Sequence, residues 1–134
     1  MTKTLDKSFY KTKKGSSGIG LFAIKKIPKG KMIIEYKGIK KADKEVEHNL
    51  TQYLFNLDNG YTLDGSPRWN TARYINHSCI PNAEAWLIGN KPYIKSIKNI
   101  EPGEEITYDY GKEFFNAYIK PKGCNCPKHK KAKK

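Results

Sequence analysis

Turn-forming residues divide this chain into short segments and leave little room for a long helix. Pro28-Lys29-Gly30, Asn59-Gly60, Gly89-Asn90 and Pro102-Gly103 each combine glycine with proline or asparagine, and such combinations mark tight turns. The segments between these turns are short and rich in apolar, aromatic and β-branched residues, as strands are. The sequence therefore predicts a mostly β fold.

Six of these segments are predicted to be strands. They cover residues 31–36, 52–57, 61–63, 83–88, 93–97 and 105–110. The second and third strands are expected to form a hairpin, and so are the fourth and fifth, because glycine and asparagine join each pair. Short helices are predicted over about residues 40–50, from apolar residues spaced at i, i+4 and i+8, and over residues 112–119.

Charge and composition limit the class of protein. The 134 residues suit one compact domain, and 26 Lys and Arg against 13 Asp and Glu give a formal charge of +13. Such an excess favours polyanions, or proteins bound to them, as partners; solubility or a lysine-biased genome is the alternative. No apolar run suggests a membrane span. Three cysteines, an odd number, argue against a closed disulfide framework and favour a reducing setting.

The segment from Asn70 to Asn82 concentrates polar and reactive side chains. Its thirteen positions include three Asn, one Arg, one His, one Ser and one Cys, which carry many hydrogen-bond donors and acceptors. Pro81 excludes a continuous helix, so the segment is predicted to be a partly buried loop. For a single Asn or His, a core loop with satisfied hydrogen bonds is the simpler interpretation. The acidic and aromatic motif near residue 105 favours a functional site.

Five short motifs follow one another along the chain. They are Gly18-Ile19-Gly20, Tyr36-Lys37-Gly38, Tyr53-Leu54-Phe55, Arg73-Tyr74-Ile75-Asn76-His77-Ser78-Cys79 with Pro81-Asn82, and Gly103-Glu104-Glu105-Ile106-Thr107-Tyr108-Asp109-Tyr110-Gly111. In residue type and order they resemble the motifs of the SET domain, the fold of protein-lysine methyltransferases. The glycine pair alone predicts only a turn whose backbone can approach a ligand, but the two long motifs are specific. The resemblance extends from about Gly18 to His129.

This resemblance implies a mostly β SET-domain fold, with several small curved sheets around a knot-like crossing and few short helices. In the crossing, the closing motif passes through a loop beside the signature motif that contains Asn76. The chain would divide into a basic N-terminal extension (1–14), a SET domain (15–119) and a post-SET-like tail rich in cysteine and lysine (120–134). The small size suggests a stand-alone member of microbial or viral type.

The resemblance also implies roles for individual residues. The cofactor S-adenosylmethionine would be bound by Gly18, Ile19, Gly20, Tyr53, Arg73, Asn76 and His77. The target lysine would enter from the opposite face, through a channel lined by Tyr36, Tyr108 and Tyr110, with Tyr110 as the principal catalytic residue. Tyr108 stands where the family has Tyr or Phe, and its hydroxyl implies mono- or dimethylation ahead of trimethylation. For any one tyrosine, core packing with a satisfied hydroxyl is the alternative.

The cysteines fall at positions where many SET proteins bind structural zinc. Cys79 lies in the signature motif, while Cys124 and Cys126 follow the closing motif. His129 would be the fourth ligand, where the family typically has Cys, and Cys3His is an ordinary tetrahedral zinc set. Free reduced thiols are the alternative.

Together these features predict an S-adenosylmethionine-dependent protein-lysine N-methyltransferase, which acts on histones or other basic, nucleic-acid-associated proteins. The lysine-rich termini predict electrostatic contact with nucleic acid; a solvated tail or an automethylation target is the alternative. The expected setting is intracellular, either the cytoplasm of a microbe or, with a histone substrate, the nucleus. The alternative from another functional class is a non-catalytic, basic SET-like module that binds chromatin or nucleic acid.

Overall fold

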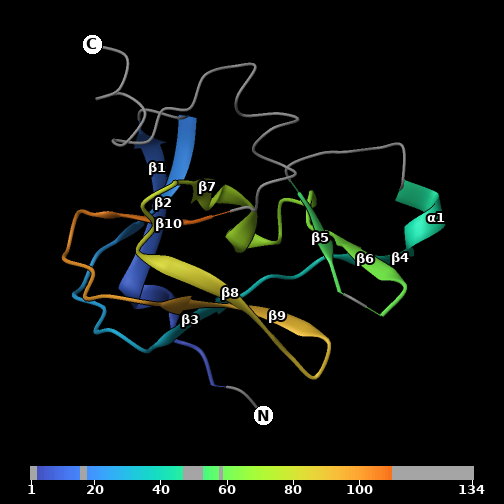
Figure 1. The fold of residues 1–134 in the computed structure, drawn as a ribbon. Coiled ribbons are helices and arrows are strands. Elements are labelled where there is room, and N and C mark those ends of the chain that lie inside the picture. The colour runs from blue at the N-terminus through green and yellow to red at the C-terminus, as the bar shows by residue number, and fades with distance from the viewer. Residues whose placement is uncertain (1–2, 16–17, 47–52, 58, 110–134) are drawn as a thin grey trace.

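The computed structural model describes residues 3–15, 18–46, 53–57 and 59–109 (Figure 1). The strands in these residues are β1 (Tyr10–Gly15), β2 (Gly18–Ala23), β3 (Met32–Glu35), β4 (Ile39–Ala42), β5 (Leu54–Asn56), β6 (Tyr61–Asp64), β7 (Asn76–His77), β8 (Ala83–Ile88), β9 (Lys91–Ser96) and β10 (Glu105–Tyr108). The helices are η1 (Lys7–Phe9), α1 (Asp43–Val46) and η2 (Thr71–Tyr74), of which η1 and η2 are 3-10 helices. The predicted mostly β fold is confirmed.

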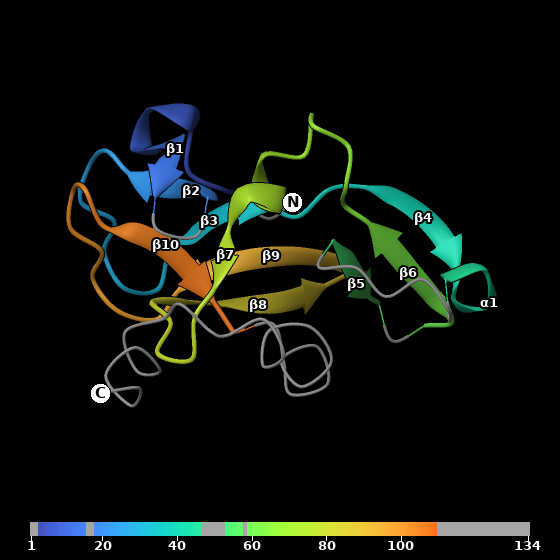
Figure 2. The same cartoon turned by 90° about the horizontal axis from the view of Figure 1, so that it is seen from above.

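The strands form two sheets that lie next to each other in both views (Figures 1 and 2). The larger sheet has the order β1-β2-β10-β8-β9-β3, and β7 also pairs with β10. The smaller sheet has the order β4-β6-β5, with α1 at its outer end (Figure 1). Two adjoining sheets of different size, rather than one layered sandwich, agree with the predicted fold class.

Strand β10 lies between strands that are distant from it in the sequence. It pairs antiparallel with β2 (Glu105 opposite Phe22) and parallel with β7 (Thr107 opposite Asn76). The glycine, signature and closing motifs are thereby brought onto adjacent strands. The predicted knot-like crossing includes the chain after Asp109, which lies outside the described residues, and it stays a prediction.

Both predicted hairpins are confirmed. Strands β5 and β6 pair antiparallel, and β8 pairs with β9 from Ala83 opposite Ser96 to Ile88 opposite Lys91. At the second turn Gly89 and Asn90 have φ of 58° and 66°, the left-handed region that tight hairpin turns require. The local turn chemistry thus fixes where the chain reverses.

The helix predicted over about residues 40–50 is wrong for its first part. Ile39–Ala42 form β4, and only Asp43–Val46 are helical. Pairing with β6 satisfies the backbone of residues 39–42, so a contact distant in sequence overrides the helical spacing of the apolar residues. Residues 47–50 and the second predicted helix, 112–119, lie outside the described residues.

The residues assigned to a basic N-terminal extension take part in the larger sheet. Strand β1 pairs with β2 along its whole length, from Tyr10 opposite Ala23 to Gly15 opposite Gly18. Tyr10 is buried, whereas the four residues that follow it, three of them lysines, are exposed. Strand β1 is therefore an outer strand whose lysines face solvent.

The core lies against the inner face of the larger sheet. Its fully buried large aliphatic side chains are Leu21, Ile27, Ile33, Ile75, Ile94, Ile100 and Ile106. Burying each such side chain contributes about 1.5–3 kcal/mol. In the described part of the chain, no helix is long and apolar enough to cross a membrane.

Candidate functional site

Gly20 forms the floor of a small polar site on one face of the larger sheet. It is a buried residue of β2, between β1 and β10. A β-carbon at this position would lie 2.4 Å from Oε2 of Glu105 and 3.1 Å from Nδ2 of Asn76. Glycine lets these two polar groups close over the strand. Gly18 and Ile19 are exposed and also belong to β2, so the glycine motif is a strand and not the predicted turn.

The side chain of Asn76 joins the signature motif to the other two motifs. Its Nδ2 donates to Oε2 of Glu105 at 2.8 Å and to the carbonyl oxygen of Ile19 at 3.3 Å. Three of the residues predicted to bind the cofactor, Ile19, Gly20 and Asn76, are therefore brought together. Glu105 was missed from the sequence. It stands in the closing motif, but its place beside Asn76 depends on β10 pairing with both β2 and β7.

The other face of β10 carries apolar and aromatic side chains. Successive residues of a strand point to opposite faces, so Glu105 and Thr107 face the polar site, while Ile106 and Tyr108 face the core. Tyr108 is buried and lies opposite His77 in the parallel pairing with β7. A polar face and an aromatic face are thus separated by one layer of strands.

The His77 side chain lies between Asp109 of the closing motif and Cys79, which, like His77, belongs to the signature motif. This side chain is only 5% exposed, and its Nδ1 lies 3.7 Å from Oδ1 of Asp109. Its Nε2 lies 3.3 Å from Sγ of Cys79, which is partly buried. The ring therefore links the predicted cofactor segment to the one predicted zinc ligand that the described residues contain.

Arg73 packs against two tyrosine rings. Its guanidinium carbon lies 4.5 Å from the ring centroid of Tyr53 and 4.9 Å from that of Tyr74, and each such contact contributes about 0.5–2 kcal/mol. Its Nε is buried without a hydrogen-bond partner among the described residues. The structure thereby joins two more of the predicted cofactor-binding residues, Tyr53 and Arg73.

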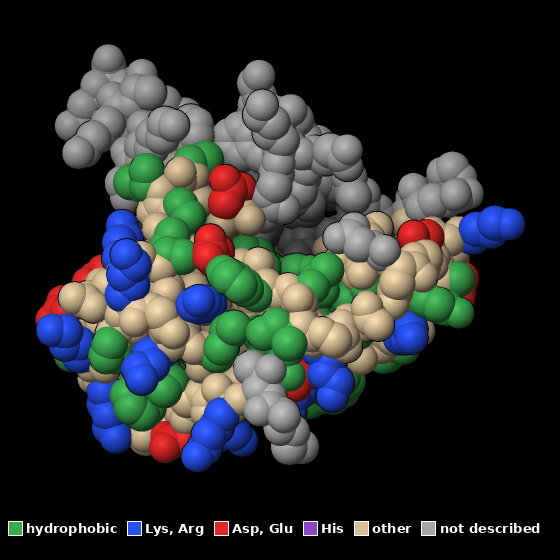
Figure 3. All heavy atoms as spheres, turned by 60° about the horizontal axis from the view of Figure 1, so that its bottom comes forward, with side chains coloured by type: hydrophobic (Ala, Val, Ile, Leu, Met, Phe, Trp, Pro, Cys, Tyr) green, Lys and Arg blue, Asp and Glu red, His purple; other side chains and the backbone are tan. Residues whose placement is uncertain are grey.

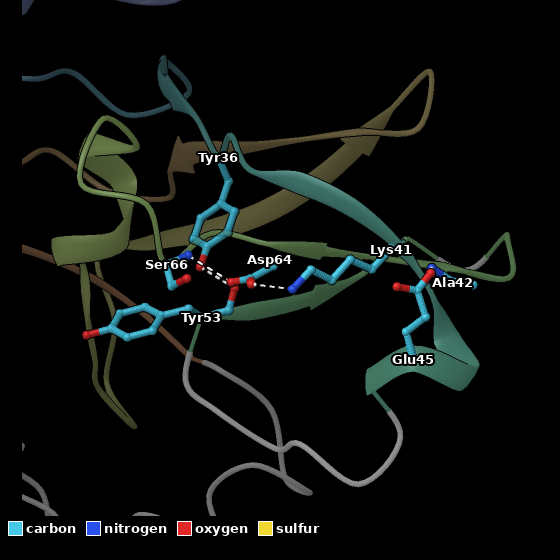
Figure 4. A network of polar contacts seen from close by, with 7 residues as sticks. All are labelled: Tyr36, Lys41, Ala42, Glu45, Tyr53, Asp64 and Ser66. Atoms are coloured by element: carbon cyan, nitrogen blue, oxygen red, sulfur yellow. Dashed lines mark hydrogen bonds and ion pairs between the residues drawn. The ribbon is translucent and has the colours of Figure 1, made fainter.

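Tyr36 is buried beside the smaller sheet, with its hydroxyl in a fixed contact. The hydroxyl donates to the carbonyl oxygen of Tyr53 at 2.9 Å (Figure 4), and a β-carbon at Gly65 would lie 2.3 Å from the Tyr36 ring. Burial is the main cause that raises the pKa of Tyr36 well above its ordinary value, and the neighbouring Tyr108 and Asp64 add to it. Tyr36 therefore stays protonated at neutral pH, as a hydrogen-bond donor on a rigid ring.

The other two asparagines of the polar segment hold backbone in place. Asn70 donates to the carbonyl oxygen of Gly65 and accepts from the backbone N–H of Lys37. Asn82 donates to the carbonyl oxygen of Glu105 and accepts from the backbone N–H of Thr107. For these two residues the simpler interpretation, a satisfied core loop, is correct. Only Asn76 faces the candidate site.

The remaining predicted site residues lie outside the described residues. They are Tyr110, Cys124, Cys126 and His129. Within the described part of the chain, no three His, Cys, Asp or Glu side chains are grouped as a metal site would require. The roles of these four residues stay predictions.

Comparison with known proteins identifies the family. A sequence model of the SET domain matches residues 18–111. A Chaetomium globosum protein named "Histone-lysine N-methyltransferase, H3 lysine-4 specific" is 38% identical over 104 residues, which are 68% of this chain and 10% of that protein. The human "Histone-lysine N-methyltransferase 2D" is 37% identical over 109 residues, 72% of this chain and 2% of that protein.

A third relative covers more of the chain. The Drosophila melanogaster "Histone-lysine N-methyltransferase Set2" is 35% identical over 125 residues, 80% of this chain and 5% of that protein. This chain therefore spans a tenth or less of the length of the three relatives. The match covers the glycine, signature and closing motifs that meet around Gly20, and the chain belongs to the SET-domain family.

Proposed function

We propose that this protein is a protein-lysine N-methyltransferase that uses S-adenosylmethionine. The observation that carries the proposal is the arrangement on β10. Glu105 closes with Asn76 over Gly20 on one face, while Tyr108 is buried beside His77 on the other. A cofactor and a lysine that approach from opposite faces would meet at this strand. Family membership and the names of the relatives support the same activity.

The residues around Gly20 suit this cofactor. S-adenosylmethionine would supply a methyl group on a positively charged sulfur, and its amino-acid end carries an ammonium group. The Ile19 carbonyl and the Glu105 carboxylate are acceptors that an ammonium group can use. Gly18 and Gly20 would leave the backbone accessible, Asn76 would contact the cofactor through its side chain, and Tyr53, Arg73 and His77 would complete the site. These residues bind and orient; they do not themselves carry the methyl group.

The aromatic residues would prepare the lysine. A lysine side chain has an ordinary pKa of about 10.4, so removing its proton at pH 7 costs roughly 4.6 kcal/mol. A narrow, water-poor channel disfavours the ammonium form and reduces this cost. Tyr108 and Tyr36 would exclude water, and Tyr110 would align the neutral amine for in-line attack. The Tyr36 hydroxyl is already engaged by Tyr53, so its part would be the ring wall. The hydroxyl of Tyr108 narrows the channel and favours mono- or dimethylation.

Mass spectrometry after incubation with methyl-labelled cofactor tests the activity. The wild-type protein should add one or two methyl groups to lysines of core histones or other basic nucleic-acid-associated proteins. Tyr110→Phe should reduce the rate by at least about a hundredfold and leave cofactor binding intact. Unchanged methylation by this variant would remove Tyr110 from its catalytic role. If wild-type protein binds no S-adenosylmethionine in calorimetry, the alternative of a non-catalytic basic module is favoured.

A histone substrate would place the protein on chromatin, and its charge suits contact with nucleic acid. The excess of 26 basic over 13 acidic residues is the supporting feature, and basic side chains are spread over the face shown in Figure 3. Neutralised phosphates release counterions, so affinity for a DNA duplex should fall steeply as salt rises from 50 to 200 mM. A salt-independent affinity would exclude this contact.

We also propose a structural zinc ion bound by Cys79, Cys124, Cys126 and His129. The support is the donor set, since three thiolates and one imidazole satisfy tetrahedral zinc. Protein purified without a histidine tag should contain about one zinc per chain, and Cys124→Ser should reduce that content. Less than half an equivalent would favour reduced thiols instead.

A further inference from the structure

Two side chains of opposite charge flank Gly20 on the face that carries Asn76. Glu105 reaches over Gly20 from β10, and Lys13 stands directly opposite Gly20 in β1. The Lys13 ammonium nitrogen lies 4.6 Å from the ring centroid of Phe22. Phe22 is opposite Glu105 in the β2–β10 pairing, so Lys13, Phe22 and Glu105 share one face of the sheet.

The negative side of this arrangement is built to receive a cation. Among the described residues, Oε2 of Glu105 accepts one hydrogen bond, from Nδ2 of Asn76, and an ionised carboxylate can accept about four in all. The carbonyl oxygen of Ile19 lies beside it, 3.3 Å from the same nitrogen. A small ammonium group above Gly20 would therefore meet a carboxylate and a carbonyl oxygen together.

Lys13, the positive side chain, lies on the opposite side of Gly20 from Glu105. Neighbouring strands lie about 4.8 Å apart, so β1 and β10, with β2 between them, are roughly 10 Å apart at the backbone. Lys13 and Glu105 can thus extend over the glycine strand from its two sides. The Phe22 ring holds the Lys13 side chain in place through a cation–π contact. Because the side chain is already ordered, it would lose less conformational entropy on binding an anion.

We propose that Lys13 and Glu105 bind the two charged groups of the amino-acid end of S-adenosylmethionine. The α-ammonium group would be received by Glu105 and the Ile19 carbonyl, and the α-carboxylate by Lys13. The reverse orientation would set like charges against each other. This inference rests on the proposed function and adds to it a charge-specific subsite whose polarity is set by β1 and β10.

Binding of charge-deleted cofactor analogues tests the inference. Lys13→Met keeps an unbranched chain over Phe22 but removes the charge. Its affinity for S-adenosylmethionine, measured by calorimetry, should fall about fivefold, while its affinity for decarboxylated S-adenosylmethionine should equal that of wild type. Lys14→Met is the matched control, because Lys14 is the next residue of the same strand but lies opposite Ile19, with its side chain on the other face of the sheet, and it should change neither affinity.

The second half of the subsite has its own variant. Glu105→Gln keeps an oxygen that can accept from Asn76 but loses the negative charge. It should weaken binding of S-adenosylmethionine by about tenfold and leave unchanged the binding of an analogue with hydroxyl in place of the α-amine. Circular dichroism and thermal melts establish that each variant is folded.

The outcomes separate this inference from the proposed function. The charge-specific subsite would be overturned if a variant lost as much affinity for the matching analogue as for S-adenosylmethionine, or if neither variant lost affinity at all. Methylation by the wild-type protein would still stand in either case. Absence of any cofactor binding by the wild-type protein would overturn both.

Discussion

The buried hydroxyl of Tyr36 links the stability of this protein to alkaline pH. Burial, together with nearby Tyr108 and Asp64, raises the pKa of this group, so the native state holds the proton more tightly than the unfolded chain does. The resulting stability is complete below about pH 10, the ordinary pKa of tyrosine, and is lost as pH rises above it. The relevant window therefore lies above the pH at which the proposed methyl transfer would be assayed.

Tyr36→Phe should be less stable than the wild type below this window and should become the more stable of the two as pH rises through it. At pH 8 the variant loses the hydrogen bond to Tyr53 and should be less stable by about 1 kcal/mol. Above pH 10 the wild type should lose about 1.4 kcal/mol per pH unit relative to the variant. Urea unfolding at several pH values measures the difference in unfolding free energy between wild type and variant. The other tyrosines contribute equally to both proteins, so their contributions cancel in this difference. A difference that stays constant up to pH 11 would contradict it.

Two glycines should respond differently to the same substitution. A β-carbon at Gly38 would lie 2.3 Å from the carbonyl oxygen of Asp64, a backbone atom fixed by the β4–β6 pairing. At Gly20 the obstacle is the flexible end of the Glu105 side chain. Gly38→Ala should thus cost about 1–3 kcal/mol of unfolding free energy, and Gly20→Ala less.

The order should be the opposite for cofactor affinity. Gly20→Ala displaces Glu105 from its place beside Asn76 and should weaken S-adenosylmethionine binding at least about tenfold, whereas folded Gly38→Ala should bind normally. Urea unfolding and calorimetry on both variants test the pair. If Gly20→Ala loses only stability, its role is structural.

At the scale of the elements, Asn82 takes the place of a partner strand. Within the described residues, β8 pairs with β10 only at Ala83 opposite Tyr108. Just before it, the Asn82 amide donates to the carbonyl of Glu105 and accepts from the N–H of Thr107. This side chain therefore supplies the two backbone groups of β10 with partners that a longer pairing would have provided.

Substitution of Asn82 should loosen β10. Asn82→Ala leaves both backbone groups without their partner and should destabilise the protein by about 2–3 kcal/mol, while Asn82→Asp should cost more because a carboxylate then faces the Glu105 carbonyl. Asn99→Ala, which removes one exposed hydrogen bond to the Lys29 N–H, is the control and should cost less than about 1 kcal/mol. Equal losses in Asn82→Ala and the control would refute this role.

Local patterns predicted the hairpins, whereas pairings between distant segments decided the rest. The β5–β6 and β8–β9 turns could be located because Asn-Gly and Gly-Asn have conformations that few other residues adopt. Residues 39–42 could not be assigned from local spacing, since β6 pulls them into a sheet. The insertion of β10 between β2 and β8 leaves no local signature at all.

The candidate site shows the same division. Asn76 and Gly20 could be predicted because they stand inside motifs with a recognisable order. Lys13 and Glu105 could not be paired with them, since their common face follows from the registers of β1 and β10 with β2. Asn70 and Asn82 match Asn76 in residue type, and only the structure separates the two that support backbone from the one that faces the site.

At the scale of the whole molecule, charge should oppose folding. With a formal charge of +13, the positive side chains repel one another more strongly in the compact state than in the expanded chain. Salt shortens the range of this repulsion, because the Debye length falls from about 30 Å at 0.01 M to about 8 Å at 0.15 M.

The melting temperature, measured without nucleic acid or cofactor, should therefore rise as sodium chloride increases from 0.01 to 0.15 M. Each 1 kcal/mol of repulsion removed should raise it by about 3–6 °C. Changing Lys11 and Lys14, exposed residues of the outer strand β1, to glutamine should reduce the salt-dependent rise, because fewer charges then remain to be screened. A melting temperature that falls over this range would show that attractive ion pairs, such as that between Lys41 and Asp64, outweigh the net repulsion.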